Sequence, residues 1–412
     1  MMNTIVIKEY DELHIKDKRD ITKNAISKED AISLQSIIMD EEPVFKWGFK
    51  KLIAQHWVGT ISLGDLNIEI LPKLYGSVSE EQLRAVLTRI ILVSHQKPSA
   101  REIPGSTKLD KNSLIEILID TFLSSLEKYV QEGLRHSYKK IEKNINRVKG
   151  TIVFNKQFSR NLLKPAKFWC RYSMFTADND INQFFKLCLN TMNIVSNDPS
   201  NKCRIKYLLP TFSDFTTINK EKALLKDITF NSTNQNAEES YTYGKLFLKS
   251  IFSTLNAGNT PINMMLFDMN ALFELFIFRV TRIVYKNRVS YQMRGNYLLE
   301  RDSDGKKHIA LRPDITIKVD NDSYSVIDTK WKVPKTFSKE SDVYQMNSYS
   351  TSIDKVREII LLYPLVYNKR MIDDYHFIDS NGIKRPLKIR TIDLMKCFEW
   401  RTFLNEFPEA IK

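Results

Sequence analysis

The sequence has few of the residues that build zinc sites, disulfide frameworks or nucleophilic triads. Its 412 residues include four cysteines and six histidines. The cysteines (Cys170, Cys188, Cys203 and Cys397) form no CxxC pair, which argues against zinc ribbons and disulfides, and we expect buried thiols. The sequence contains no HExxH motif and no serine-centred nucleophile motif, which excludes hydrolases of those classes.

A long apolar segment is also missing. Residues 114–126 are rich in leucine and isoleucine, but Glu116 and Asp120 interrupt them. Residues 1–4 carry no signal peptide. We therefore expect a cytoplasmic protein that makes no membrane contact.

No complete nucleotide-binding loop occurs. Gly59 and Gly64 have the separation of the two glycines in a phosphate-binding loop. Asp65 and Leu66 follow, however, where that loop requires Lys and then Ser or Thr. The chain is therefore expected to hydrolyse no nucleotide itself.

Positive charge is in excess. Lys and Arg number 62 against 49 Asp and Glu, and the net charge of +13 favours a polyanionic partner. The densest basic stretch, residues 135–171, contains one acid, Glu142, and aromatic residues interleave with its cations. This pattern predicts a surface that follows a nucleic-acid backbone, although a solvated charged face and core aromatics are the alternatives. The cations are Arg135, Lys139, Lys140, Lys143, Arg147, Lys149, Lys156, Arg160, Lys164, Lys167 and Arg171, and the aromatic residues are Tyr138, Phe154, Phe158, Phe168 and Trp169.

Residues 311–330 carry the strongest functional signal. Two segments of alternating apolar and polar residues, 315–319 and 324–328, flank a turn-forming sequence, which predicts an antiparallel hairpin. A turn centred on Asn321 places Asp314 opposite Asp328, with Lys330 on the same face. Pro313 belongs at a strand start or a bulge, where the chain bends and the next side chain is re-aimed. Two facing carboxylates repel unless a proton or cation joins them, and hard oxygen ligands suit Mg²⁺, although solvated surface acids are the alternative.

Three further polar side chains are candidates for the same site. Residues 267–278 are apolar almost all round, which predicts a buried helix in which Glu274 needs a partner. Either Arg279 or Arg282 neutralises Glu274, or it lies near the aspartates as a third acid. Gln345 and Tyr349 share one face of a helix that starts near residue 341, so both can reach one phosphate or a metal-bound water. An ordinary surface helix is the alternative for this pair.

These residues resemble known nuclease motifs. Asp314, Asp328 and Lys330 resemble the motif of the PD-(D/E)XK nuclease superfamily, and Gln345 with Tyr349 matches the QxxxY motif of its RecB-like branch. The wider sequence resembles the McrC family, the nuclease subunits of McrBC modification-dependent restriction systems. Besides the hairpin, the resembling segments are residues 59–73, 147–152, 176–182 and 268–274.

The resemblance implies a Mg²⁺-dependent endonuclease that cuts double-stranded DNA. Asp314, Asp328 and the main-chain carbonyl of Thr329 would bind the metal, and Lys330 would orient the attacking water. A separate McrB-like AAA+ GTPase hexamer would bind GTP and move along DNA, while this chain stimulates GTP hydrolysis and cuts. A double-strand break needs two nuclease centres, which suggests a homodimer in the assembled complex. Two other functions stay open: a stand-alone RecB-like or structure-specific nuclease, and a non-catalytic activator of an AAA+ motor.

We expect an α/β protein of three segments. Residues 1–145 form a mixed α+β domain, which the resemblance implies docks on the GTPase, with a projecting polar loop at 96–105. Residues 146–262 form an intermediate region with the basic surface. Residues 263–412 form the nuclease domain, a PD-(D/E)XK restriction-endonuclease-like mixed sheet flanked by helices. The expected strands are 4–7, 57–70, 151–154, 168–172, 315–319, 324–328, 358–366 and 386–391, and the expected helices are 80–94, 114–132, 182–195, 241–255, 267–278, one from 341 and 393–405.

Overall fold

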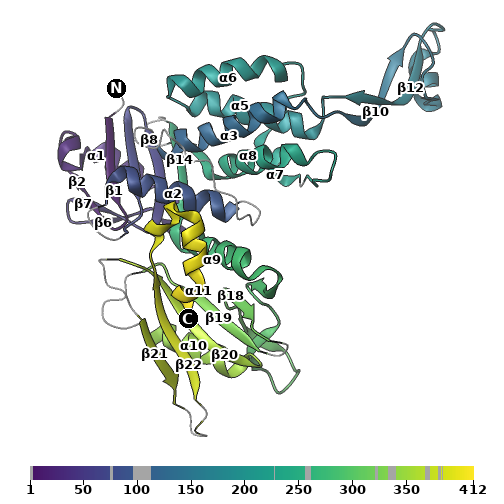
Figure 1. Cartoon of the computed structure of the whole chain (residues 1–412). Coiled ribbons are helices and arrows are strands. Elements are labelled where there is room, and N and C mark those ends of the chain that lie inside the picture. The colour runs from purple at the N-terminus through teal and green to yellow at the C-terminus, as the bar shows by residue number, and fades with distance from the viewer. Residues whose placement is uncertain are drawn as a thin grey trace. The chain divides into compact units, whose positions relative to one another are not determined.

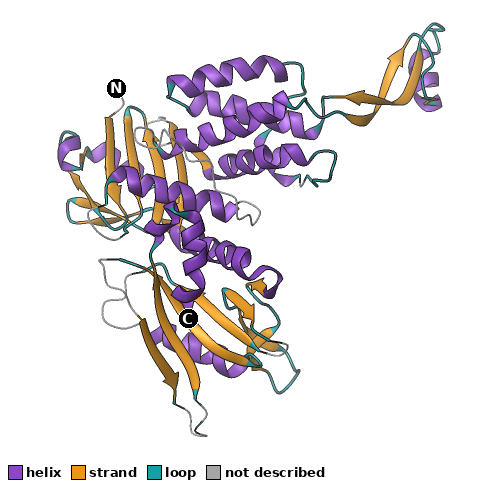
Figure 2. Cartoon of the chain, viewed as in Figure 1, coloured by secondary structure: helices purple, strands orange, loops and turns teal. Residues whose placement is uncertain are grey.

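The chain folds into two compact units (Figures 1 and 2). Unit 1 combines Met1–Ile117 with Ser250–Lys412, and unit 2 is Leu118–Lys249. The computed structural model describes residues 3–74, 78–95, 113–226, 228–255, 261–320, 323–332, 340–366, 372–378, 382 and 384–412.

A five-stranded sheet forms the first part of unit 1. Its strand order is β1-β9-β8-β14-β13, with β1 parallel to β9 and the other neighbours antiparallel. The apolar side chains of β8 and β9, such as Ile61 and Ile68, are fully buried and explain why these segments form inner strands. The bounds are β1 Asn3–Lys8, β8 Trp57–Leu63, β9 Leu66–Leu71, β13 Ile251–Leu255 and β14 Pro261–Asp268.

Smaller sheets and one capped helix complete this part of unit 1. Ser27 and Asp30 form a capping box that starts α1 (Lys28–Gln35). The four-stranded sheet has the order β3-β2-β7-β6, and β4 pairs with β5. The bounds are β2 Glu12–Ile15, β3 Ala25–Ile26, β4 Ile38–Met39, β5 Glu42–Pro43, β6 Phe45–Gly48 and β7 Lys51–Ala54, with a 3₁₀ turn η1 at Ile21–Lys23.

A six-stranded mixed sheet forms the second part of unit 1. Its order is β15-β18-β19-β20-β22-β21, in which β19, β20 and β22 are parallel and the other pairs antiparallel. A two-stranded sheet, β16-β17, comes before β18 in the chain. The bounds are β15 Val289–Tyr291, β16 Asn296–Glu300, β17 Lys307–Leu311, β18 Ile315–Lys318, β19 Tyr324–Thr329, β20 Val356–Pro364, β21 Ile372–Phe377 and β22 Arg385–Ile392.

Helices flank the mixed sheet. Met346 and Tyr349 of α10 (Glu340–Ser352) pack on Val326 and Leu361 of the sheet in one buried cluster. Helix α9 (Met269–Tyr285) packs against α11 (Trp400–Ile411) through rings such as Phe276. The hydroxyl of Ser94, at the end of α2 (Glu80–His95), donates to the main-chain carbonyl of Leu272 in α9 at 3.3 Å. Short 3₁₀ turns are η3 at Lys286–Arg288 and η4 at Leu394–Phe398.

Unit 2 consists of helices and a long strand pair. Gly244 of α8 allows close packing, because a Cβ there would lie 2.8 Å from Cys188 of α5. Arg204 of α6 joins α3 through ion pairs with Asp120 (2.6 Å) and Glu127 (2.7 Å). The helices are α3 Leu114–Gln131, which starts in unit 1, α4 Phe154–Asn161, α5 Asp180–Val195, α6 Pro199–Phe212, α7 Lys220–Leu225 and α8 Glu238–Ser250, with a 3₁₀ turn η2 at Gln235–Ala237.

The strand pair of unit 2 carries the basic stretch. Strand β10 (Ser137–Ile145) pairs antiparallel with β12 (Phe168–Thr176) along nine residues, and β11 (Thr151–Ile152) joins β12. The register places Ser137 and Thr176 at one end, and Ile145 and Phe168 at the other. Helix α4 follows β11 and therefore lies at the second end, away from the helices that join the first end (Figure 1). We call β10, β11, α4 and β12 the arm.

The expected α/β fold with a mixed sheet flanked by helices is confirmed. The hairpin and the helices expected at 80–94, 114–132, 182–195 and from 341 agree with the structure within a few residues, whereas the helix expected over 267–278 is α9, which continues to Tyr285. The expected helix at 241–255 is wrong over its last part, because Ile251–Leu255 is β13. The expected helix at 393–405 is replaced by the turn η4 followed by α11. Cys203 is exposed, contrary to expectation, whereas the other three thiols are buried.

The two units divide the chain differently from the three segments expected from the sequence. The reason is that β14 pairs with β8, which joins residues 261–268 to the first sheet. The roles assigned to the three segments stay predictions. The expected loop at 96–105 and the centre of the hairpin turn at 321–322 lie outside the described residues. None of the helices in the described part of the chain combines the length and apolar character that crossing a bilayer requires.

Candidate functional site

The hairpin brings Asp314 and Asp328 together, as predicted. Strands β18 and β19 pair with Ile315 opposite Ile327 and Lys318 opposite Tyr324. The same register places Asp314, one residue before β18, opposite Asp328. Pro313 lies before the first residue of β18, where its missing N–H costs no ladder hydrogen bond.

Asp328 is a fully buried carboxylate. The Nζ atom of Lys330 lies 2.6 Å from its Oδ2 atom. Apart from this ion pair, neither carboxylate oxygen has a hydrogen-bond partner among the described residues. Burial raises the pKa of Asp328, and the positive charge of Lys330 opposes that increase. The charge of Asp328 in turn raises the pKa of Lys330, although burial acts the other way.

Asp314 is held by the residue that follows Asp328. The main-chain N–H and the hydroxyl of Thr329 both donate to Oδ2 of Asp314, at 2.7 Å and 2.8 Å. Burial raises the pKa of Asp314, and the negative charges of Asp328 and Glu274 raise it further. The site therefore has a negative field strong enough to retain a proton, or to bind a cation in its place.

Glu274 lies close enough to both aspartates for its negative charge to raise the pKa of each. Its Oε1 accepts a hydrogen bond from Nε2 of Gln292 at 2.9 Å. Within the described residues, no ion pair joins Glu274 to Arg279 or Arg282, and Nε of Arg279 donates instead to a main-chain carbonyl of α2 at 3.2 Å. The geometry therefore favours the interpretation of Glu274 as a third acid over a plain ion pair.

Lys330, Gln345 and Tyr349 form a hydrogen-bonded chain. Nζ of Lys330 donates to Oε1 of Gln345 at 3.2 Å, and Nε2 of Gln345 donates to the Tyr349 hydroxyl at 2.8 Å. The Tyr349 hydroxyl donates to the carbonyl of Arg312 at 3.1 Å. Burial raises the pKa of Tyr349, so its hydroxyl stays a donor. Helix α10 thus connects the ammonium group of Lys330, through Gln345 and Tyr349, to the chain segment that carries Asp314.

The structure adds residues that the sequence analysis did not identify. Gln292 follows β15, whose pairing with β18 is a contact between distant segments, and its N–H donates to the carbonyl of Asp314 at 2.9 Å. Asp342 in the first turn of α10 is buried, and its charge raises the pKa of Asp328. Lys332 forms an ion pair with Asp342. In the sequence, the one indication for Lys332 is its spacing: it lies two residues after Lys330, and side chains two apart in an extended chain lie on the same face.

The chemistry of the donors fits a divalent cation only in part. Two carboxylates converge, and among the described residues the buried Asp328 has no hydrogen-bonding partner other than the ammonium group of Lys330. Mg²⁺ commonly uses one or two carboxylates and completes its shell with water and phosphate oxygens. The described residues contain no group of three or more His, Cys, Asp or Glu side chains placed to hold a metal. A complete protein shell is therefore not present, and bound substrate and water would supply the remaining ligands.

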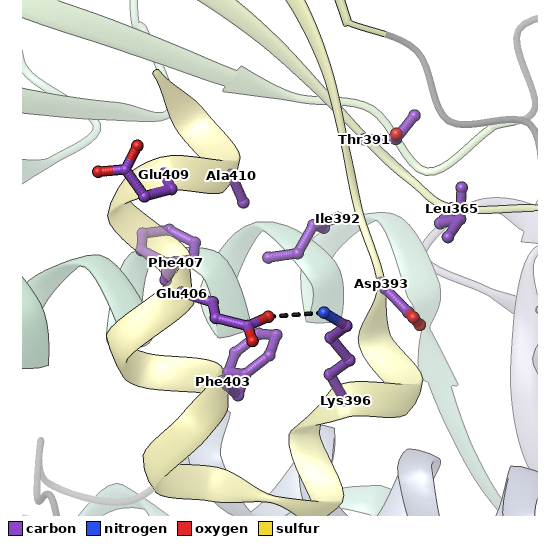
Figure 3. Close-up of a pocket in the computed structure, with 10 residues that line it drawn as sticks. All are labelled: Leu365, Thr391, Ile392, Asp393, Lys396, Phe403, Glu406, Phe407, Glu409 and Ala410. Atoms are coloured by element: carbon purple, nitrogen blue, oxygen red, sulfur yellow. Dashed lines mark hydrogen bonds and ion pairs between the residues drawn. The ribbon is translucent and has the colours of Figure 1, made fainter.

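A separate cavity of about 440 Å³ lies beside α11 (Figure 3). Its lining includes Ile392, Phe403 and Phe407, and an ion pair between Lys396 and Glu406 at 2.6 Å crosses it. None of the predicted site residues lines this cavity.

Comparisons with known proteins found one family model and solved structures that resemble the chain. A family model described as McrBC 5-methylcytosine restriction system component matches residues 52–364. A solved half-complex of a tetradecameric assembly of Thermococcus gammatolerans McrB AAA+ hexamers with bound McrC has a similar chain. That chain is 18% identical, with a TM-score of 0.65 over 98% of this chain and 100% of its own length. A chain of the T. gammatolerans McrBC complex matches with 18% identity and a TM-score of 0.49, over 67% of this chain and 86% of that chain. No curated protein sequence matches the chain.

Proposed function

Because the chain belongs to the family of McrBC 5-methylcytosine restriction system components, we propose that it is the DNA-cleaving subunit of a McrBC-like complex. The proposed activity is hydrolysis of phosphodiesters in double-stranded DNA, with a separate AAA+ GTPase as partner. GTP binds to that partner and not to this chain, which contains no complete phosphate-binding loop.

One observation carries the nuclease proposal. The half-buried Asp314 and the fully buried Asp328 converge at the end of a hairpin, and the ammonium group of Lys330 lies 2.6 Å from Asp328. Such a cluster is expensive to bury, since like charges repel and desolvation disfavours both ionised groups. A purely adaptor protein has no physical need for it. The mixed sheet and the flanking α10 are compatible with the PD-(D/E)XK core.

The residues of the site have different roles in the proposed reaction. Asp314, Asp328 and the Thr329 carbonyl would hold Mg²⁺, which when bound polarises the scissile phosphate and acidifies a water. Lys330 orients the attacking water and offsets negative charge as it develops on the phosphate. Gln345 fixes the position of Lys330 through the 3.2 Å hydrogen bond. Glu274 adds negative charge that favours a cation over an empty site.

The decisive experiment is cleavage of modified and unmodified DNA by the purified chain, with and without its AAA+ partner, GTP and Mg²⁺. We expect cleavage only with all components present. Asp328→Asn and Lys330→Ala should each reduce cleavage by at least about 100-fold while partner binding is retained. Asp302→Asn is the matched control, because Asp302 is exposed in the same part of unit 1.

The outcomes separate the alternatives. Cleavage by the chain alone, without partner or GTP, would identify a stand-alone nuclease. If Asp328→Asn cuts at the wild-type rate, the site assignment is wrong. If the chain stimulates GTP hydrolysis but neither it nor its complex cuts any DNA, it is an activator. Since cleavage of both strands needs two centres, we also expect two copies of the chain in the active complex.

We further propose that the tip of the arm binds the AAA+ partner. Apolar side chains of α4 and of the turn that follows it are exposed, including Phe154, Phe158 and Leu162, and Leu163 is 91% exposed. Phosphates are contacted by cations, whereas an exposed apolar cluster favours a protein surface. The solved assembly of T. gammatolerans names McrC as bound to McrB AAA+ hexamers. The cations of the arm remain our candidates for DNA contact.

A matched pair of variants tests the arm. Leu163→Asp should abolish co-purification with the partner and GTPase stimulation. Leu225→Asp is the control, because Leu225 is 86% exposed on α7 of the same unit. The partner-binding proposal fails if Leu163→Asp binds the partner normally. Weaker DNA binding of the isolated chain in Leu163→Asp would indicate instead that the tip binds nucleic acid.

A further inference from the structure

A second buried carboxylate lies outside the proposed centre. Glu9 directly follows β1, and its side chain is fully buried. The main-chain N–H of Lys73 donates to its Oε2 at 3.1 Å, and the indole Nε1 of Trp331 lies 3.0 Å from both carboxylate oxygens. The N–H of Glu9 itself donates to the carbonyl of Leu71 at 3.0 Å. Glu9 therefore joins the ends of β1 and β9 to a residue 322 positions further along the chain.

Stability alone does not explain this carboxylate. Burial raises the pKa of Glu9 to about 8, and the charge of Asp268 adds to that increase, while Lys73 and Trp331 oppose it. The charge of Lys73 is shared, since its ammonium group pairs with Asp11 at 3.7 Å. A buried acid without its own ion pair costs stability, and an apolar side chain of similar volume would cost less. Carboxylates perturbed in this way often have a functional role.

Trp331 connects Glu9 with the two chain segments that form the proposed centre. It is the residue directly after Lys330, whose N–H donates to the carbonyl of Leu362 at 3.0 Å. The indole ring packs on Phe273, with 5.3 Å between ring centroids. Phe273 precedes Glu274 in α9. The buried Trp331 thus belongs to the segment that carries Lys330 and contacts the helix that carries Glu274.

We propose that Glu9 is a positioning residue for the nuclease centre and acts through Trp331. The inference rests on the proposed nuclease function. Glu9 fixes the indole, and the indole fixes the main chain that emerges from β19, so that Thr329 and Lys330 keep their places beside the two aspartates. Through this contact, the first sheet of unit 1 also helps to position the residues of the proposed centre. A shift of about 1 Å in a catalytic group lowers a rate by about 100-fold.

Three variants separate positioning from folding. Glu9→Ala removes the acceptor, Glu9→Gln keeps a carbonyl oxygen, and Trp331→Phe removes the donor but keeps a ring. Glu69→Ala is the control, because Glu69 is a buried acid of the same sheet that pairs with Arg84 at 2.8 Å. Each variant is assayed as the full chain, with the AAA+ partner, GTP and Mg²⁺, at a temperature where it is folded.

Single-turnover cleavage gives the first result. Glu9→Ala and Trp331→Phe should each lower the cleavage rate by about 10- to 100-fold, without weaker DNA binding. Glu9→Gln should recover most of the rate. The double variant should be no slower than the slower single variant, because both changes break one contact. Glu69→Ala should cut at the wild-type rate.

Fluorine NMR of protein labelled with 5-fluorotryptophan gives a second, independent result. The chain has five tryptophans, and the Trp331 resonance is the one lost in Trp331→Phe. Glu9→Ala should shift that resonance, and Mn²⁺ added without DNA should broaden it at higher metal concentration than in wild type. The inference is overturned if Glu9→Ala shifts the resonance yet cuts and binds Mn²⁺ like wild type, or if the resonance does not move. If the wild-type complex cuts no DNA, the nuclease proposal fails, while the Mn²⁺ titration still decides whether Glu9 positions the carboxylate centre.

Discussion

Thr329 holds Asp314 through two hydrogen bonds to one oxygen. Its N–H and its hydroxyl donate to Oδ2 at 2.7 Å and 2.8 Å, so the carboxylate is fixed without engaging Oδ1. Thr329 comes directly after Asp328 in β19. The two aspartates are therefore coupled through the main chain as well as through their charges.

The first prediction concerns the Thr329 hydroxyl. Thr329→Val removes one of the two hydrogen bonds and keeps the shape of the side chain. Hydrogen bonds to charged groups contribute about 1.5 to 3 kcal/mol, so we expect cleavage to fall by roughly 10-fold or more. The measurement is single-turnover cleavage by the complex. Thr281→Val is the control, because the buried Thr281 hydroxyl bonds within α9, to a carbonyl four residues earlier. Equal rates for Thr329→Val and wild type would show that the main-chain N–H alone positions Asp314.

The second prediction concerns Tyr349. Its hydroxyl accepts from Gln345 at 2.8 Å and donates to the carbonyl of Arg312 at 3.1 Å, so Tyr349→Phe leaves both groups without this partner. We expect a loss of about 1 to 3 kcal/mol in the free energy of unfolding, together with slower cleavage, because Gln345 no longer holds Lys330 firmly. Urea denaturation and cleavage assays measure the two effects.

The matched control for Tyr349 lies on the same helix. Tyr344 of α10 is 69% exposed, and Tyr344→Phe should change neither stability nor cleavage. If Tyr349→Phe loses stability but cuts DNA at the wild-type rate, the QxxxY pair has a structural role only. That was the alternative left open for this pair by the sequence.

The local parts of the site could be predicted from the sequence. The hairpin register follows from two alternating segments around a turn, and Ile315 does pair with Ile327 as that pattern requires. Helix α10 and its face with Gln345 and Tyr349 follow from spacing alone. Glu274 was predicted as a candidate, but its orientation toward the aspartates depends on how α9 packs.

The non-local parts could not be predicted. Gln292 reaches the site because β15 pairs with β18, and Glu9 reaches Trp331 across 322 positions. Neither contact leaves a periodic signal in the sequence. The sequence predicts a helix through residues 251–255, because so short a mixture of apolar and polar residues fits a helix end as well as a strand. In the structure, this segment pairs with β14 and is therefore a strand.

The third prediction is a pH dependence of stability that belongs to Glu9. Its pKa rises from 4.5 to about 8 on folding, because the side chain is buried. Between these values the folded chain retains a proton that the unfolded chain releases, so stability falls as pH rises from about 5 to about 8. The stabilising contribution is complete below the unfolded pKa and is lost as pH passes the folded value. The slope is at most about 1.4 kcal/mol per pH unit.

Urea denaturation of wild type and Glu9→Gln between pH 5 and pH 8 measures this slope. Glutamine does not titrate, so the difference between the two proteins isolates Glu9 from the aspartates, which are present in both. Wild type should lose stability relative to Glu9→Gln as pH rises. Parallel curves would mean that Glu9 keeps an ordinary pKa in the folded protein.

The fourth prediction concerns Gly59, where β8 passes close to β14. Its φ is +137°, and a Cβ atom there would lie 2.0 Å from the main-chain oxygen of Met265. Gly59→Ala must therefore push β8 and β14 apart. Gly295→Ala is the control, because Gly295 also has a positive φ, +100°, but no atom of the described residues lies within 4 Å of its Cβ position. The control carries only the backbone strain, about 1 to 3 kcal/mol.

We expect Gly59→Ala to lower the free energy of unfolding by clearly more than Gly295→Ala, since it adds a clash with main-chain atoms to the same strain. Thermal unfolding of the two variants beside wild type makes the comparison. Because β14 leads directly into α9, which carries Glu274, Gly59→Ala should also lower the rate of cleavage. Gly295→Ala should leave that rate unchanged. Equal losses in the two variants would mean that β8 and β14 are not packed as closely as this structure has them.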